Sequence, residues 1–444
     1  METQLIKGKP VKVIIAFALP LIIANLFQML YTTVDTIIVG QYVGTLALAS
    51  VGVTSPVVDL LLGLAIGLAN GLSIVIAQKI GSKQIIEVKK AMINGLYIMI
   101  VLGLSITCIG LMIQSTLFQW MNVSKKLLSG ALNYAGIIFI GALFTALYNY
   151  ESALLRAYGD SVTPLLFLIL SAILNIVFDL VFVLIFHLGI SGVALATVIA
   201  QLICCLLCYF YMKKRLHLFS FDKEDFKIDF ICIKENLKVG LPMAFFQSLL
   251  AISFLIVQSA LNSLGSQEVA AYTAAYKMDS LMMQMLAGFG TAMSTYTAQN
   301  YGQRAFKRIK EGSKSMLVIT ITLSIVVTIM AHLFNKQFMM LFVSKKEIEV
   351  IHLGMKYISF TSWFYFVLGI NFIVRFVLTG LGEASIPLIV GILEVIVRCL
   401  GTYFLVYPLG FTGMTYINPL CWITSTFLIC CLYPYLLHKA FNGK

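Results

Sequence analysis

Seven charged side chains within long apolar stretches are candidates for action inside a membrane: Asp35, Asp59, Asp179, Lys277, Asp279, Glu394 and Arg398. On insertion scales a charge at the centre of a bilayer costs about 2.5–3.5 kcal/mol, so residues that bear this cost usually face a bundle interior and act there. Burial disfavours the charged form of a carboxylate, which can then take up a proton or hold a cation. The chemistry that these residues suggest is therefore ion exchange.

Two acids in the first half have polar neighbours at helical spacing. Tyr31 precedes Asp35 by four residues and Asn175 precedes Asp179 by four, so each pair shares one helix face. The Thr197 hydroxyl, on the next expected helix, can join them. This group contains no base, and protonation of an acid would change the desolvation cost of its pocket, as proton coupling requires. The alternative is that Asp35 lies near the outer interface and Asp179 bonds locally to hold helices together.

The charges of the second half are of mixed sign. Glu394 and Arg398 are spaced i, i+4 with the acid first, the favourable order for a helix pair, so a structural bridge competes with a substrate site. Lys277 and Asp279 are two residues apart and cannot face each other on a helix. Each needs a partner elsewhere, and Lys277 with Glu394 is one option. A cationic drug would be attracted to the acid-only first half more than to this one.

Four further features are candidates for cavity lining, gating or packing. Asp59, after Ser55 and Pro56, either lines a cavity or bonds to nearby backbone. Met282 lies in a methionine-rich stretch that suits an adaptable apolar pocket, although lipid-facing or core packing is the commoner explanation. Pro20 lies inside the first apolar segment, where it can kink or unwind a helix. Close helix packing is the preferred interpretation of three glycines at small-xxx-small spacing, Gly63, Gly67 and Gly71.

The elements that must position these residues follow from composition. Of 444 residues, 60% are hydrophobic and 11% charged, against about 25% charged in soluble domains. Soluble enzymes, disordered proteins and nucleic-acid-binding modules are thereby excluded. A span needs about 20 apolar residues and must be helical in lipid. Twelve such segments can be drawn, at 13–39, 46–76, 91–117, 128–150, 162–187, 192–212, 240–262, 269–297, 315–342, 353–378, 386–407 and 412–437.

The basic residues predict the orientation. Of the 31 Lys and Arg, 23 fall on one side of the twelve segments and 6 on the other. The positive-inside rule then places both termini in the cytoplasm of a multi-pass protein of the plasma (inner) membrane. The nine cysteines lie mostly inside apolar stretches and show no metal spacing with histidine, so no disulfide frame, zinc site or other metal site is expected.

The sequence contains an internal repeat, in which short motifs recur at an offset close to half the length of the chain. The matching pairs are Pro20 and Pro242, Gln78 and Gln299, Pro164 and Pro387, and Gly192 and Gly413, and their offsets are nearly identical. We therefore predict an N-lobe of six transmembrane helices over 1–212, a cytoplasmic amphipathic connector over 213–238 that resembles an interfacial helix, and a C-lobe of six over 239–444.

The chain resembles the multidrug and toxic compound extrusion (MATE) family over essentially its whole length. The resemblance rests on ALPLIIANLFQMLYTTVDTIIVGQYVG at 18–44, AQKIG at 77–81, RAYGDSVTP at 156–164, and the segments AAYTAAYKMD and TAQNYGQR. It implies an all-α membrane protein with twelve helices in two pseudo-symmetric six-helix lobes around a central cavity. It also implies export of organic, often cationic, compounds against a proton or sodium gradient, with a cation network that matches Tyr31, Asp35, Asn175, Asp179 and Thr197.

The chain departs from one sodium-coupled branch of that family. Those members carry carboxylates in the seventh and tenth helices, whereas 240–262 and 353–378 contain no Asp or Glu. A proton exchanged at Asp35 and Asp179 is therefore favoured, with sodium at the same acids as the alternative. The expected protein is a non-enzymatic antiporter without cofactors that works as a monomer on small amphipathic, mostly cationic compounds and binds no nucleic acid.

Three rival functions stay open. A lipid-linked precursor flippase shares a related fold, but a cavity for anionic headgroups needs buried bases, and only Lys277 and Arg398 lie well away from the segment ends. An intramembrane enzyme would need a nucleophile–base pair or a metal set, and no such motif occurs. A channel is disfavoured because two fused repeats with internal acids suit rocking motions better than a permanent pore.

Overall fold

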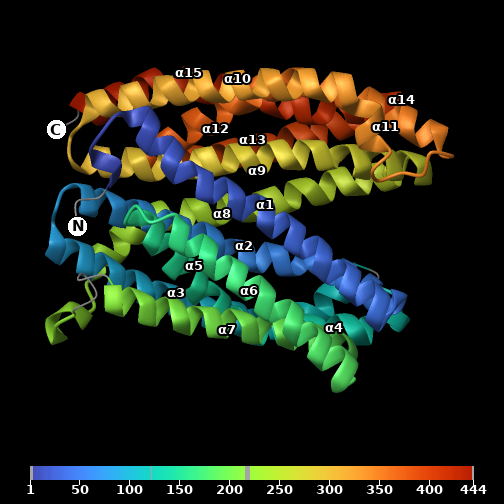
Figure 1. Ribbon diagram of the computed structural model, residues 1–444, viewed down its shortest axis with the longest axis horizontal. Coiled ribbons are helices and arrows are strands. Elements are labelled where there is room, and N and C mark those ends of the chain that lie inside the picture. The colour runs from blue at the N-terminus through green and yellow to red at the C-terminus, as the bar shows by residue number, and fades with distance from the viewer. Residues whose placement is uncertain (1–3, 122, 216–220, 443–444) are drawn as a thin grey trace. The chain divides into compact units, whose positions relative to one another are not determined.

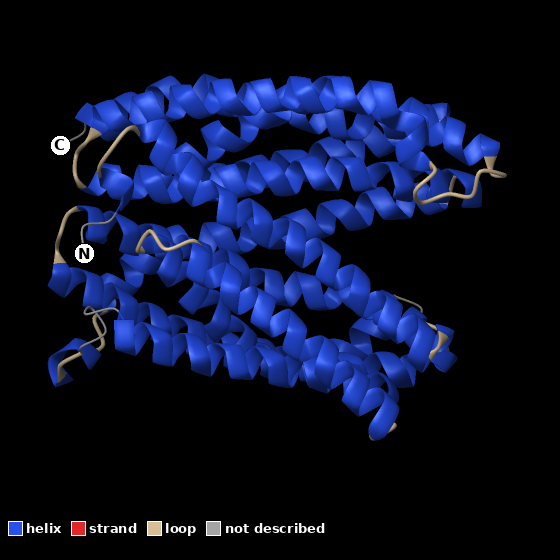
Figure 2. Ribbon diagram, in the orientation of Figure 1, coloured by secondary structure: helices blue, strands red, loops and turns tan. Residues whose placement is uncertain are grey.

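The computed structural model describes residues 4–121, 123–215 and 221–442, which contain helices and loops but no strand (Figures 1 and 2). The first half holds α1 (Pro10–Ile38), α2 (Thr45–Gly81), α3 (Ile85–Trp120), α4 (Lys125–Ile140), α5 (Ala142–Ala157), α6 (Val162–Leu180) and α7 (Gly189–Arg215). The second half holds α8 (Phe230–Asn262), α9 (Ser266–Gly302), α10 (Phe306–Met339), α11 (Ile348–Thr361), α12 (Tyr365–Gly380), α13 (Ser385–Gly401), α14 (Tyr407–Leu409) and α15 (Phe411–Asn442).

Helices cover all twelve predicted apolar segments. Within the described residues, ten spans are long and apolar enough to cross a membrane, and an eleventh is α4 with α5, a pair bent by 49°. The segment 269–297 lies in α9, which is long enough but is not among those ten. Its buried side chains include several polar ones, such as Asp279, Gln299 and Asn300. Because α9 packs against α10, α11 and α12, these polar groups are shielded by protein.

The internal repeat is carried by the backbone. The break between α4 and α5 recurs between α11 and α12, and the π-helical turn Val181–Ile185 recurs at Thr402–Val406, at the offset of the sequence repeat. Residues with positive φ recur at nearly the same offset, as the pairs Gly44 and Gly265, Lys83 and Arg304, Gly159 and Gly382, and Gly189 and Gly410. The repeat found in the sequence therefore corresponds to a repeat of the backbone structure.

The chain divides into two compact units. Unit 1 is Leu26–Ala251, and unit 2 comprises the chain up to Asn25 together with the chain from Ile252 onward. The boundaries lie inside α1 and α8, whereas the lobes predicted from the sequence change at the connector 213–238. The first helix of each repeat therefore begins in one unit and ends in the other.

The connector is not the continuous amphipathic helix that its sequence resembles. In its described part, α7 ends at Arg215, a short 3₁₀ turn covers Lys223–Phe226, and α8 begins at Phe230. Aspartates interrupt the helix because their side chains cap backbone N–H groups: Asp222 and Asp225 form a capping box, and Asp229 accepts from the N–H groups at the start of α8. The Tyr97 hydroxyl of α3 anchors the turn by donating to the Phe226 carbonyl at 2.9 Å.

The glycine stripe of α2 packs against α8 within unit 1. A Cβ on Gly71 would lie 2.5 Å from Cα of Gly240, and one on Gly67 would lie 2.6 Å from Cα of Ala244. Both obstacles are backbone atoms, which cannot rotate away. The predicted packing role is therefore confirmed for Gly67 and Gly71, because only glycine lets the two helix backbones approach this closely, whereas a Cβ at Gly63 would make only ordinary contacts.

The N-terminal segment is fastened to unit 2. Leu5 is 1% exposed, and its carbonyl accepts from Asn300 Nδ2 at 3.2 Å and from the Arg308 guanidinium at 3.3 Å. The same guanidinium donates to the Gly8 carbonyl at 2.8 Å and to Asn300 Oδ1 at 2.9 Å. Arg308 thus satisfies backbone groups that precede the first turn of α1.

Arg308→Ala should release this segment without unfolding the unit. It removes two charge-assisted hydrogen bonds to backbone carbonyls, each worth about 1.5–3 kcal/mol. We expect the amides of residues 4–8 to exchange hydrogen at least tenfold faster, as measured by mass spectrometry. Lys307→Ala is the matched control, since Lys307 is an exposed base on the same turn. Equal exchange in the two variants would show that Arg308 does not hold the segment.

Candidate cation-coupling site

Asp35 and Asp179 occupy corresponding places near the ends of two helices of unit 1. Asp35 lies in the last turn of α1, just before the π-helical turn Val39–Val43, and Asp179 lies in the last turn of α6, just before the π-helical turn Val181–Ile185. Single π-helical turns inside longer helices occur frequently at functional sites, because they reorient side chains and loosen the backbone hydrogen bonding. Asp179 is fully buried, and Asp35 is half-buried.

Asn175 connects the two helices to α7. Its side-chain amide lies 2.8 Å from the Tyr31 hydroxyl and 3.1 Å from Oγ1 of Thr197. With the amide nitrogen facing Tyr31, it also donates to Asp179 Oδ2 at 3.3 Å, while Oδ1 accepts from the backbone N–H of Thr197 at 3.1 Å. This orientation satisfies every polar atom of the amide, so Asn175 is held in one position by three helices.

The carboxyl groups of Asp35 and Asp179 lie close enough to interact directly. Two carboxyl groups can hydrogen-bond to each other only when one of them carries a proton. The Oδ1 atom of each group is buried and has no hydrogen-bond partner within the described residues. The pair therefore combines neighbouring carboxyl groups with buried acceptor oxygens, the combination that proton or cation exchange needs.

A tyrosine that the sequence analysis did not single out belongs to the same neighbourhood. Tyr134 of α4 lies within electrostatic reach of Asp35, Asp179 and Asp59. Its ring packs beside an apolar cluster that includes Val39 from the π-helical turn. Asp59 itself, on α2, is exposed on unit 1, so it stands apart from the buried hydrogen bonds of the pair. A neutral tyrosine in an apolar segment gives little signal, which is why it was missed.

The predicted residues of unit 2 take different places. Asp279 is fully buried, Glu394 is 7% and Arg398 4% exposed, while Lys277 is half-buried on a different face of α9. Met282, at 1% exposure, lies in an apolar cluster with Tyr365 and neighbours, the position of a core residue.

The expected bridge between Glu394 and Arg398 is not formed. Within the described residues, no nitrogen of Arg398 comes within ion-pair distance of the Glu394 carboxylate, nor does that of Lys277. Arg398 instead donates to Asn418 Oδ1 at 2.8 Å. The i, i+4 spacing brings two side chains to one helix face, but Asn418 on α15 offers the guanidinium a nearer acceptor.

Pro20 lies in the part of α1 that belongs to unit 2. The helix runs from Pro10 to Ile38 without interruption, so the proline does not unwind it here. Because proline has no backbone N–H, one i→i−4 hydrogen bond of α1 is absent at Pro20. The helix is therefore easier to bend there than elsewhere.

Thr197→Val should weaken cation binding without removing an acid. The variant deletes the hydroxyl that bonds to Asn175 and to the Val193 carbonyl at 3.2 Å, while keeping the side-chain volume. A hydrogen bond of this kind contributes about 1 kcal/mol, so we expect a roughly fivefold weaker response of transport to the coupling cation. Thr197→Ser keeps the hydroxyl and should behave like the parent. Equal loss in both variants would assign the effect to packing.

Comparisons with known proteins agree with this architecture. The MatE family model matches the chain twice, over residues 20–181 and 242–404, and the two matches begin at the paired prolines of the repeat. The probable multidrug resistance protein YoeA of Bacillus subtilis (strain 168) is 28% identical over 386 residues, which cover 85% of this chain and 83% of the relative. The multidrug export protein MepA of Staphylococcus haemolyticus (strain JCSC1435) is 22% identical over 84% of this chain and 82% of its own. A crystal structure of MATE in complex with MaL6 superimposes with a TM-score of 0.92 at 24% identity, over all of both chains.

Proposed function

The chain belongs to the MatE family, and on that premise we propose that it is a secondary active exporter of small organic compounds, coupled to the inward movement of a cation. Its relatives are named as multidrug resistance or multidrug export proteins, and its all-helical, membrane-spanning architecture suits the same task. A proton is the favoured coupling ion and sodium the alternative.

The observation that carries this proposal is the carboxyl pair of unit 1. Asp35 and Asp179 lie together in a network that joins α1, α6 and α7. A proton or a sodium ion would neutralise negative charge on the pair. Because Asn175 bonds to Asp179 and also to Tyr31 of α1, a change in the charge of the pair would alter the contacts between α1 and α6. This gives a cation a direct way to favour one conformation over another.

The topology completes the proposal. We propose twelve spans arranged as two six-helix halves, with α9 as the most polar span and α4 with α5, and α11 with α12, as broken spans. The excess of bases on one side then places both termini in the cytoplasm of a monomer in the cell membrane. Parallel repeats of this kind are a transporter architecture in which alternating access moves one half against the other.

The substrates are proposed to be amphipathic cations. In unit 1, Asp35, Asp59 and Asp179 all lie within electrostatic reach of Tyr134, and among the described residues no Lys or Arg is bonded to them, so this region attracts positive charge. The rival function, transport of an anionic lipid-linked precursor, calls for free buried bases. Arg398 is tied to Asn418, which makes it a weak candidate for phosphate binding.

The test is efflux from proteoliposomes under separately imposed gradients. Purified protein is reconstituted with an internal fluorescent cationic dye and given either a pH gradient or a sodium gradient, with the membrane potential clamped by valinomycin and potassium. We expect dye movement with the pH gradient, collapsed by a protonophore, and none in protein-free liposomes. Movement with the sodium gradient alone would assign sodium to the pair. Movement that neither gradient changes would contradict cation coupling.

A further inference from the structure

Unit 2 contains a buried polar network centred on Asp279 of α9. The Tyr357 hydroxyl donates to Asp279 Oδ2 at 2.6 Å, and the Tyr365 hydroxyl donates to Oδ1 at 2.7 Å. Asn418 Nδ2 adds a third bond to Oδ2 at 3.2 Å, while its Oδ1 accepts from Arg398 at 2.8 Å. All five side chains are below 5% exposure, so the network is closed inside the unit.

This network lies at the positions that the repeat pairs with the site of unit 1. The repeat pairs Tyr357 with Tyr134, Arg398 with Asn175, and Asn418 with Thr197. The offsets of these pairs are the ones at which the positive-φ residues and the π-helical turns recur. The two networks therefore occupy the same place in the duplicated backbone. The acids themselves come from different helices, Asp279 from α9 and Asp35 and Asp179 from α1 and α6, and a guanidinium at position 398 stands where unit 1 has the Asn175 amide.

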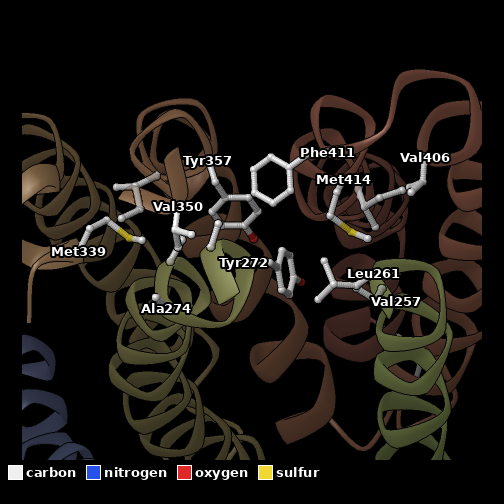
Figure 3. Close-up of a cluster of buried hydrophobic side chains, with 14 of the residues drawn as sticks. Val257, Leu261, Tyr272, Ala274, Met339, Val350, Tyr357, Val406, Phe411 and Met414 are labelled. Carbon is white, nitrogen blue, oxygen red and sulfur yellow. The ribbon is translucent and has the colours of Figure 1, made fainter. Parts of the chain in front are cut away.

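The surroundings explain how a buried charge is tolerated there. Tyr357 packs edge-on against Tyr272 at 5.2 Å in an apolar cluster that includes Phe411 (Figure 3). The guanidinium of Arg398 lies over the Phe254 ring at 5.5 Å, a cation–π contact. A guanidinium keeps its charge under all ordinary conditions. It therefore supplies a permanent positive charge one side chain away from Asp279.

We propose that unit 2 holds a second cation site in which the Arg398 guanidinium is a tethered, non-exchangeable cation, and that removing it converts the surroundings of Asp279 into a site for a monovalent cation, either a proton or sodium. Asp279 then gives no ion response in the native protein, because its counter-charge is covalently present. This inference does not depend on Asp35 and Asp179 coupling transport.

Other ionisable groups near the network interact electrostatically with its charged residues. Glu394 acts on both Arg375 and Arg398, and Cys421 and the tyrosines 272 and 276 also face the guanidinium. Lys277 is on α9 itself but two residues from Asp279, so it points to another face. Removing Arg398 alone leaves two acids, Asp279 and Glu394, with one buried base, Arg375. A deficit of one positive charge is what an added cation would fill.

The test uses full-length protein that carries D35N and D179N, so that unit 1 contributes no ion response. The melting temperature Tm of the purified protein is measured in sodium chloride against choline chloride at equal ionic strength, and between pH 5.5 and 8.5. The background protein should show no sodium dependence, and its pH dependence, to which the remaining titratable groups contribute, is the baseline. Adding R398Q should make Tm rise by about 4 °C with sodium or with acid, as expected when a ligand binds only the folded state.

The second variant separates charge from packing. D279N/R398Q removes both charges and should lose the ion response while recovering the stability of the background protein. D279N alone leaves the guanidinium without its acid and should melt below the double variant. An R398Q protein whose Tm ignores both ions would overturn the proposal. So would failure to recover folded protein from both R398Q and D279N/R398Q, since Arg398 would then act by packing.

Discussion

Asp179→Asn is expected to abolish cation-coupled efflux and leave the protein folded. Asparagine has nearly the size of aspartate and keeps hydrogen-bonding groups for Asn175 and Asp35, so the network of α1, α6 and α7 remains closed. What disappears is the carboxyl group that can change its charge. Gradient-driven dye efflux from proteoliposomes should fall at least a hundredfold, to the level of empty liposomes, while Tm stays within a few degrees of the parent.

Asp35→Asn should have the same consequence, because the two carboxyl groups belong to one pair. The matched control is Glu224→Gln, which neutralises an exposed acid whose pairing with Lys227 contributes little in water. Full coupled efflux in either the Asp35 or the Asp179 variant would refute the assignment. Equal loss in the Glu224 variant would show that neutralising any acid of unit 1 is harmful, and the pair would have no special role.

Gly67→Ala is expected to destabilise unit 1 more than any other single methyl group added to α2. The new Cβ would overlap the Met243 carbonyl oxygen and approach Cα of Ala244 to 2.6 Å, so α2 and α8 must separate. Overpacking of this kind costs about 1–3 kcal/mol. In a protein of this size the loss should lower Tm by roughly 1–3 °C, measured by scanning fluorimetry in detergent.

Gly52→Ala is the control on the same helix. A Cβ at Gly52 meets nothing within 4 Å, so the substitution adds helix propensity without a clash and should leave Tm unchanged or slightly raised. A Gly67 variant as stable as the Gly52 variant would mean that the close approach of α2 and α8 is not required in the membrane. Efflux by the Gly67 variant should fall with its folded fraction.

The site of unit 1 could be predicted because its signals are local. A spacing of four residues fixes a shared helix face whatever the tertiary structure, so Tyr31 with Asp35 and Asn175 with Asp179 could be paired from sequence. Thr197 followed because α6 and α7 are consecutive and therefore adjacent. Tyr134 could not be found in this way, because its helix, α4, is not next to α1 or α6 in the chain. A neutral side chain in an apolar segment also does not stand out as a charged one does.

The site of unit 2 shows where local signals end. Glu394 and Arg398 have the spacing of an ion pair, yet the partner of Arg398 is Asn418, twenty residues away on another helix. Whether a side chain bonds to a neighbour on its own helix or to an acceptor on another helix depends on tertiary packing. The repeat was the signal that could have found Asn418, because its offset from Thr197 can be read without a structure.

The division of α1 and α8 between the units bears on how such a chain arose. If the two repeats descend from one half-length polypeptide, the beginning of its first helix would have belonged to one folded unit and the remainder of the chain to another. The ancestor would then have been a homodimer whose subunits exchanged that helix reciprocally, an arrangement known as domain swapping. Gene fusion would have preserved the exchange and freed the copies to diverge, as the amide at position 175 and the guanidinium at position 398 have done.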